Sequence, residues 1–428
     1  MELHFNLVQS AALALVLLAL GEWARNRLSF LRRFCFPAPV IGGFLFALLV
    51  LLLRQTHIAE IDFDTSLQSP AMVAFFTTIG LAGSLASIKK GGKLLLVYLV
   101  ACWTLAIMQN LIGIGMAKVM GINPVLGVMA GAVSLEGGHG AAAAFGPTAE
   151  SMGVQGATTV AIASATFGLV AGSLLGGMTA SFLVARHNVS IPERRGVRGA
   201  MATAGAIARN MATGRGPDLS ITVPEDKPES VSTTKSKPGL DYSSLLTVAV
   251  VIGLVMVFGM ALGNWISSLT GFALPDYVGA MIIAVVFRNL NDKFGWIRID
   301  DETVSLVSQF TLGFFLTLAM MSLKIWELAS LAGPLVVILV VELLFILSFA
   351  AFVVFRMLGR NYDAATMVAG FIGHGLGATP NALANMDAFN AKFGIRSERA
   401  FLIVPLAGAV LIDLVALPWI VWCLNWVG

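Results

Sequence analysis

Residues 134–144 read SLEGGHGAAAA, and residues 373–381 read GHGLGATPN. In both stretches glycines bracket a histidine, and both are too rich in glycine and small polar residues for an ordinary membrane helix. Each stretch follows four apolar runs and precedes a fifth. This arrangement predicts two re-entrant hairpins in a duplicated membrane protein, which is the organisation of many secondary transporters.

The composition excludes several other classes of protein. Of 428 residues, 57% are hydrophobic and only 12% are charged, which is about half the charged fraction of a soluble protein. The three cysteines are too far apart for a metal site or a disulfide framework. The chain has no P-loop, HExxH, nucleotide fingerprint or GxSxG elbow. We therefore expect no enzyme activity, no organic cofactor and no nucleic-acid partner, and we expect an ion gradient as the source of energy.

Apolar runs of about 20 residues, the length that crosses a hydrocarbon core, predict ten membrane helices. They lie near 7–24, 37–53, 70–88, 94–117, 157–185, 244–263, 276–289, 303–323, 332–357 and 399–426. The expected fold is an all-α polytopic membrane protein with two five-helix repeats, 1–186 and 241–428. Re-entrant loops are expected at about 124–153 and 362–394. The stretch 187–240 is rich in Pro, Ser and Thr and predicts a solvated cytoplasmic linker.

Charge predicts the orientation of the helices. Basic residues follow the first apolar run and do not precede it, so that run is a membrane helix and not a signal peptide. With the N-terminus outside and five spans in each half, the outside loops hold only Arg54, Lys118 and Lys324 of the 27 basic residues. Both termini are then periplasmic. Because five is odd, the second repeat enters from the opposite face, which predicts an inverted repeat.

The two hairpins are the expected substrate site. At a broken helix, free amide N–H groups bind carboxylates and free carbonyls bind cations. The residues expected to contact substrate from the hairpins are Ser134, Gly138, His139, Gly140, Gly375, Gly377, Thr379 and Asn381. The alternative is that the glycines serve only close helix packing. For the two histidines, His139 and His374, we expect imidazoles that cap free backbone groups at the hairpin tips, with a proton relay as the alternative.

Polar groups inside the apolar spans are the other candidates, because charge at this depth is costly. Asp413, midway along the last span, is expected to meet a substrate ammonium or a sodium ion. Glu342 is expected to be a packed, neutral or paired residue, and Glu136 has no assigned role. Neutral oxygens suit sodium, so the expected sodium ligands are Gln109, Asn110, Thr166, Asn385 and Asp413. Interhelical hydrogen bonding is the alternative for the neutral ones.

Several strings resemble the bacterial sodium/glutamate symporter family. They are MQNLIGIGMA (108–117), GGHG (137–140), GHGLGATP (373–380), AFFTTIGL (74–81) and ATFGLV (165–170). The resemblance covers nearly all of both membrane halves and leaves out the linker. It implies sodium-coupled uptake of L-glutamate across the bacterial inner membrane by a homodimer that moves its substrate site in an elevator fashion.

Two other functions stay open from the residues alone. One is an ion-coupled carrier of another organic anion, such as a dicarboxylate or citrate. The other is a passive channel built on paired re-entrant loops.

Overall fold

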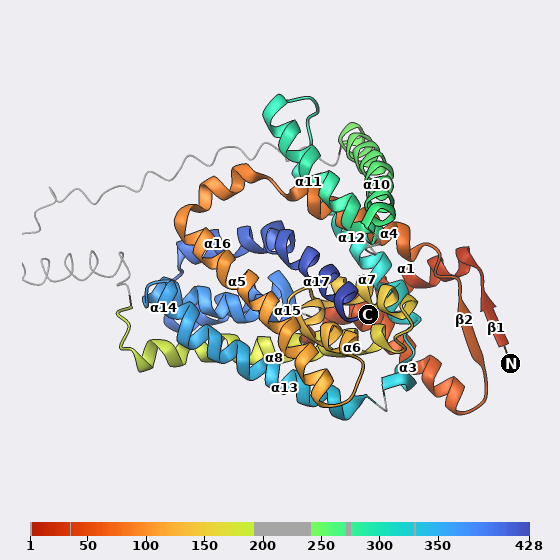
Figure 1. Cartoon of the computed structure of the whole chain (residues 1–428), viewed down its shortest axis with the longest axis horizontal. Coiled ribbons are helices and arrows are strands. Elements are labelled where there is room, and N and C mark those ends of the chain that lie inside the picture. Colours follow the sequence, from red (N-terminus) through yellow and green to blue (C-terminus); the bar gives the residue numbers. More distant parts are fainter. Residues whose placement is uncertain (1, 35, 192–240, 271–274, 329–330) are drawn as a thin grey trace, which may run out of the picture.

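The helices of the described residues form two bundles, and each bundle combines segments from both halves of the chain. The computed structural model describes residues 2–34, 36–191, 241–270, 275–328 and 331–428 (Figure 1). Most of the expected linker, 192–240, lies outside these residues. Polar residues cap several helices at their first turn; for example, Asn361 accepts the amide of Ala364 at 2.8 Å.

The first bundle, called here the peripheral bundle, contains spans one to three of each half. Its members are α1 (Leu7–Arg27), α3 (Ala38–Gln55), α4 (Gln68–Ala82), α10 (Tyr242–Thr270), α11 (Asp276–Phe294) and α12 (Asp301–Met321). The short α2 (Ser29–Arg33) lies between α1 and α3. Glycines let these helices approach closely, because a Cβ on Gly21 or Gly279 would overlap the backbone of the neighbouring helix.

The second bundle, called here the hairpin bundle, contains the remaining spans and both hairpins. From the first half come α5 (Leu85–Val119), α6 (Pro124–Val128) with η1 (Met129–Val133), α7 (Gly138–Ser151) and α8 (Ala157–Arg186). From the second half come α13 (Ala332–Phe349) with η3 (Ala350–Val354) and α14 (Phe355–Met357), α15 (Tyr362–Phe393), and α16 (Glu398–Leu406) with η4 (Ala407–Leu411) and α17 (Asp413–Val427). The short η2 (Ile325–Leu328) lies between α12 and α13.

The helical segment α15 doubles back on itself. The hydroxyl of Tyr362, at its start, donates to Asn390, near its end, at 3.0 Å. A straight helix would separate these residues by about 42 Å, at about 1.5 Å per residue. A Cβ on Gly373 would overlap the backbone of Ala382 on the opposite arm. The reversal therefore lies between these two residues, in the GLGATP stretch.

The first glycine-rich stretch is also a reversal. The arm formed by α6 and η1 packs on α5, and the arm formed by α7 packs on α8. The connection between the arms includes Glu136 and Gly137, whose amides both bond to the carbonyl of Ala132. Gly138 has a φ of 62°, a left-handed conformation that glycine adopts without a steric penalty.

Two features differ from the expected all-α protein with ten long spans. The strands β1 (Glu2–Phe5) and β2 (Glu60–Phe63) pair in parallel beside α3, and no such ribbon was expected. Within the described part of the chain, seven helices are long and apolar enough to cross a membrane. Of the other three expected spans, α4 has 15 residues, α11 has a polar second half, and the last is divided between α16 and α17.

Candidate functional site

The tips of both hairpins line one cavity of about 530 Å³ between the two bundles, called here the inner cavity. The first hairpin contributes residues 136–141, and the second contributes His374, Gly377, Thr379 and Pro380. Asp413, at the start of α17, lines the same space. On the opposite wall, the peripheral bundle supplies residues from α1, α3, α4 and α12. Segments that are far apart in sequence thus meet at one site.

Two adjacent residues in α5 connect the hairpins. The Gln109 amide donates to the carbonyl of Gly375 in the second hairpin at 2.9 Å. The Asn110 carbonyl oxygen accepts the amide of Ala132 in the first hairpin at 3.0 Å. Both side chains are fully buried. In this structure these expected sodium ligands serve as hydrogen-bonding links between α5 and the two hairpins.

The helix α8 contacts both hairpins as well. A Cβ on Gly168 would meet the carbonyl of Leu376 from the second hairpin and the side chain of Leu135 from the first. Further along α8, the carbonyl of Gly172 accepts the Asn385 amide at 3.0 Å. Small residues on α8 therefore allow both reversals to lie against the same helix.

The two histidines bond to side-chain hydroxyls on neighbouring helices. His139 Nε2 lies 3.0 Å from the hydroxyl of Thr166 on α8, and His374 Nδ1 lies 2.9 Å from the hydroxyl of Tyr98 on α5. The expectation that they cap backbone groups at the tips is therefore wrong. A hydroxyl can donate or accept, so it satisfies an imidazole in either tautomer. The Nε2 of His374 is buried and has no partner among the described residues.

Acidic side chains outnumber basic ones in the inner cavity. The acidic and strongly basic residues that line it are Glu22, Arg25, Glu136 and Asp413. The guanidinium of Arg25 is already paired with Glu22 at 2.7 Å. Glu136 lines this cavity from the first hairpin, and Asp413 lines it from the start of α17. An anionic ligand bound here therefore needs backbone amides or a co-bound cation to balance its charge.

The expected site residues separate into two groups. Those that line the inner cavity are Gly138, His139, Gly140, Gly377, Thr379 and Asp413. The others do not line the inner cavity and instead form hydrogen bonds within the protein. They are Ser134, Gly375, Asn381, Gln109, Asn110, Thr166 and Asn385. Glu342 is buried and has no hydrogen-bond partner among the described residues, so of the expected alternatives it is a packed residue and not a paired one.

Asn381 is an example of the second group. Its side-chain carbonyl accepts the hydroxyl of Ser173 at 2.7 Å, and its amide donates to the carbonyl of Leu169 at 3.4 Å. We expect Asn381→Ala to lower the free energy of unfolding by about 1–3 kcal/mol, because it leaves buried groups unpaired. Thermal unfolding in detergent measures this change. Asn26→Ala, at an exposed amide, is the matched control and should change stability by less than about 0.5 kcal/mol.

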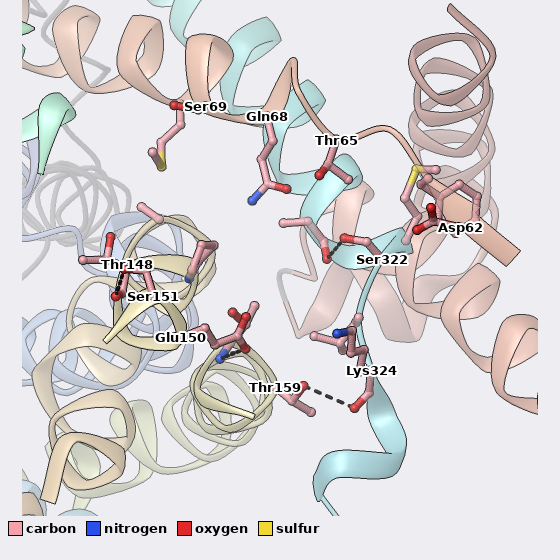
Figure 2. A pocket seen from close by; sticks show the side chains of 18 of the residues that line it. Asp62, Thr65, Gln68, Ser69, Thr148, Glu150, Ser151, Thr159, Ser322 and Lys324 are labelled. Carbon is pink, nitrogen blue, oxygen red and sulfur yellow. Dashed lines mark hydrogen bonds between the residues drawn. The ribbon is translucent and has the colours of Figure 1, made fainter. Parts of the chain in front are cut away.

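A second cavity, of about 940 Å³, is lined by other stretches of α3, α4, α7, α8 and α12 and is called here the outer cavity (Figure 2). Its rim includes Asp62, Glu150 and Lys324, and the hydroxyl of Thr159 donates to the carbonyl of Lys324 at 3.4 Å. Helix α7 lines both cavities, with Ala141 in the inner one and Ala144 in the outer one.

An aromatic layer separates the two cavities. Phe76 lines the inner cavity and stacks at 4.7 Å, centroid to centroid, on Tyr277, which lines the outer one. Phe145 meets the edge of Tyr277 at 5.2 Å. All three rings are at least nine-tenths buried. No path for water or a polar solute is expected through rings packed in this way.

Sequence reasoning missed Tyr98 and the pair of Glu22 with Arg25. Tyr98 is one of only four tyrosines in the chain and lies inside an apolar run, so its hydroxyl could have been recognised as a group that needs a partner. The position of Arg25 beside the hairpin tips has no signal in the sequence, because the contact forms between the two bundles.

Comparison with known proteins gives a consistent result. Residues 3–207 and 220–395 match the model of the family described as Sodium/glutamate symporter. The chain is 39% identical over 418 residues to the sodium/glutamate symporter of Escherichia coli strain K12, with 96% of each chain covered. It is 35% identical over 416 residues to that of Haemophilus influenzae, with 97% of this chain and 96% of the relative covered. Together with the long apolar helices, these matches identify a multi-pass membrane protein that is a transporter and not an enzyme. The chain belongs to the sodium/glutamate symporter family.

Proposed function

We propose that this protein imports L-glutamate together with sodium across the bacterial inner membrane. The observation that carries the proposal is the inner cavity, where both hairpin tips and Asp413 meet in a chain of this family. No organic cofactor is needed, because the sodium gradient supplies the energy. The relatives named above are sodium/glutamate symporters, which supports the same substrate and ion here.

Backbone amides at the start of α7 are the proposed carboxylate site. Gly138, His139 and Gly140 form the first turn of this helix, where N–H groups lack partners within the helix. The positive end of the helix dipole also points at this turn. Thr379 is proposed to contribute to the same site from the second hairpin. Asp413 is proposed to balance the substrate ammonium or a sodium ion, since both are cations and it lines the same cavity.

The ten-span inverted repeat is also part of the proposal, and the packing of helices supports it. Helix α3, the second expected span, packs on α12, the eighth. Helix α11, which is the seventh span and the counterpart of α3 in the second half, packs on α4, the third span. In the hairpin bundle, α5 packs on α16 while α13 packs on α8. Each of these contacts therefore has an equivalent contact in which every helix is replaced by its counterpart from the other half of the chain. A two-fold axis in the membrane plane produces this pattern.

Alternating access by relative movement of the two bundles follows from the same arrangement. In the orientation that the basic residues favour, the inner cavity, lined by Arg25 and Pro37, opens toward the cytoplasm. The outer cavity, lined by Arg54 and Lys324, opens toward the periplasm. The hairpin bundle carries both tips, so it is the proposed moving part. A homodimer stays a prediction, which molecular mass in detergent would test.

Transport assays separate this function from its alternatives. We expect purified protein in liposomes to accumulate labelled glutamate when sodium is outside, and a sodium ionophore to abolish the accumulation. A carrier of another organic anion would show competition by unlabelled citrate or a dicarboxylate that exceeds competition by glutamate. A passive channel would equilibrate glutamate without accumulating it. Accumulation that persists without a sodium gradient would contradict the proposal.

A cross-link between the bundles should stop transport. Thr159 in the hairpin bundle contacts Lys324, which follows α12, the last helix of the peripheral bundle along the chain. In a background with all three native cysteines replaced, we expect oxidation of a Thr159→Cys, Lys324→Cys pair to reduce uptake at least about tenfold, because relative movement of the bundles is required. Reductant should restore it.

The control for this cross-link lies within one bundle. The hydroxyl of Ser84 donates to Asp292 at 2.7 Å; Asp292 lies in α11, and Ser84 follows α4, which packs on α11. Oxidation of Ser84→Cys with Asp292→Cys should leave uptake within about twofold, since these residues move together. Equal loss of uptake from both pairs would argue against relative movement of the two bundles.

A further inference from the structure

We propose that the imidazole of His139 accepts a hydrogen bond from the ammonium group of the substrate through Nδ1, and that Thr166 positions the ring for this contact. The inference rests on the proposed function and deepens it, because it identifies a group that distinguishes an amino acid from a dicarboxylate or citrate. His139 lies in the first turn of α7 and lines the inner cavity. Thr166 lies on α8, with its hydroxyl 3.0 Å from Nε2 of the ring.

The hydroxyl of Thr166 decides which ring nitrogen carries the hydrogen. It already donates to the carbonyl of Ile162, one turn back on α8, at 2.9 Å. A hydroxyl has a single hydrogen, so toward His139 this oxygen acts as an acceptor. Nε2 is therefore the protonated nitrogen of a neutral imidazole. Two hydrogen bonds then run in sequence, from Nε2 to Thr166 and from Thr166 to Ile162.

The other orientation of this hydroxyl makes fewer hydrogen bonds. If Thr166 donated to Nε2, its bond to Ile162 would be lost and the imidazole hydrogen would lie on Nδ1. One hydrogen bond would then replace two. Hydrogen bonds in sequence also strengthen one another where the dielectric constant is low, so the structure favours the form with hydrogen on Nε2.

The second ring nitrogen, Nδ1, is the one that a substrate can reach. It has no hydrogen-bond partner among the described residues, and unlike Nε2 of His374 it is not fully covered by protein atoms. In the tautomer that Thr166 selects, Nδ1 has a lone pair and no hydrogen. It therefore presents a hydrogen-bond acceptor to the inner cavity, and it does not suit a carboxylate.

An ammonium group suits this acceptor better than a sodium ion does. Sodium is a hard cation that prefers oxygen ligands, whereas an N–H donor bonds well to an imidazole nitrogen. An ammonium group also has three N–H donors, so a bond to His139 leaves two for other acceptors.

Few carboxylates of the inner cavity compete with His139 for the ammonium. Of those that line it within the described residues, Glu22 is paired with Arg25 at 2.7 Å. Both side-chain oxygens of Glu136 are buried. Asp413 is then the carboxylate available to balance the charge, while His139 supplies a directed hydrogen bond.

The place of His139 in the chain also suits an amino acid. Its backbone N–H belongs to the first turn of α7, where the proposed carboxylate site lies. In an α-amino acid the carboxylate and the ammonium are bonded to the same carbon. One residue therefore offers a donor for the carboxylate from its backbone and an acceptor for the ammonium from its ring. A dicarboxylate or citrate has no ammonium and loses the second contact.

Paired changes in the protein and in the substrate test the assignment. Uptake of labelled glutamate into liposomes is measured over a range of concentrations, with glutarate, which lacks the ammonium, as a competitor. We expect His139→Leu to raise the KM for glutamate about 10- to 100-fold, because a hydrogen bond to a charged group is lost. Inhibition by glutarate should change by less than about twofold. His139→Asn, whose amide oxygen can accept the same hydrogen bond, should recover most of the affinity.

His187→Leu is the matched control. His187 caps the end of α8, where Nδ1 lies 3.2 Å from the carbonyl of Leu183, and it is not among the residues that line the inner cavity. We expect a KM within about twofold of that of the natural protein. An unchanged KM in His139→Leu would overturn the inference. So would an equal loss of affinity for glutamate and glutarate, which would indicate a structural role.

A spectroscopic measurement reports the tautomer and does not depend on transport. The chain has five histidines, so nitrogen NMR of protein with isotope-labelled histidine in detergent can resolve His139, which the His139→Asn spectrum identifies. We expect hydrogen on Nε2, and an Nδ1 signal that shifts when glutamate is added. Hydrogen on Nδ1, or a signal that glutamate does not move while the protein transports glutamate, would overturn the inference. Absence of sodium-driven glutamate uptake by the natural protein would instead contradict the proposed function.

The same spectrum tests Thr166 as a positioning residue. Thr166→Val removes the acceptor for the hydrogen on Nε2, so we expect both tautomers of His139 and a KM for glutamate raised at least about fivefold. Thr166→Ser keeps the hydroxyl and should restore a single tautomer and a KM within about twofold of that of the natural protein. A single tautomer with hydrogen on Nε2 in Thr166→Val would show that the hydroxyl does not position the ring.

Discussion

Asp413→Asn is expected to weaken binding of the transported cation by roughly 100-fold, with nearly complete loss of sodium-driven glutamate uptake. The charge of Asp413 faces a cavity in which no unpaired lysine or arginine is described, so it is the proposed partner of a substrate ammonium or a sodium ion. Removal of one partner from a buried charge pair costs about 3 kcal/mol. Initial uptake rates over a range of sodium and glutamate concentrations measure the effect.

The control for Asp413 is Asp387→Asn. Asp387 is exposed on the second arm of α15, and the substitution makes the same chemical change away from the inner cavity. We expect its uptake to stay within about twofold of that of the natural protein. If Asp413→Asn keeps the sodium dependence and the glutamate affinity of the natural protein, the role assigned to Asp413 is wrong.

Gly373→Leu is expected to separate the arms of the second hairpin and abolish uptake. Even a Cβ at this position would overlap the backbone of Ala382 on the opposite arm, and backbone cannot move aside as a flexible side chain can. Overpacking of a closely packed interface costs about 1–3 kcal/mol and sometimes more. We expect a lower free energy of unfolding of about this size, measured by thermal unfolding in detergent, together with loss of uptake.

Gly115→Leu is the matched control for Gly373→Leu. Gly115 lies in α5, and apart from its own turn of helix no heavy atom would lie within 4 Å of an added Cβ. We expect stability and uptake close to those of the natural protein. Uptake by Gly373→Leu that equals uptake by Gly115→Leu would mean that close approach of the arms is not needed for transport.

The sequence predicted the two reversals from glycine content, and the structure shows the chain turning back near each of them. Glycine marks places where backbone turns or approaches other backbone, so this signal is local. The role of Gln109 and Asn110 could not be predicted in the same way. Their position at midspan indicated a need for partners, but which hairpin each one meets depends on helices that are far apart in sequence.

The histidines illustrate the same limit. Their pattern predicted importance at the hairpin tips, and both do line the inner cavity. Their partners are hydroxyls on α8 and α5, however, and not the backbone of the tips. A sequence records that an imidazole lies in an apolar surrounding, but a hydrogen bond needs a distance and an angle that only packing supplies.

The sequence alone determined that this is a membrane transporter with two broken helices, because the length of apolar runs, the glycine content and the motifs are local properties of the sequence. Only the tertiary structure decided which polar groups share one cavity. It grouped Glu136 with Asp413, placed Asn381 and Asn385 in contacts with α8, and divided the inner from the outer cavity with rings from three helices. The reason is that these contacts join residues that are distant in sequence, and packing between helices fixes them.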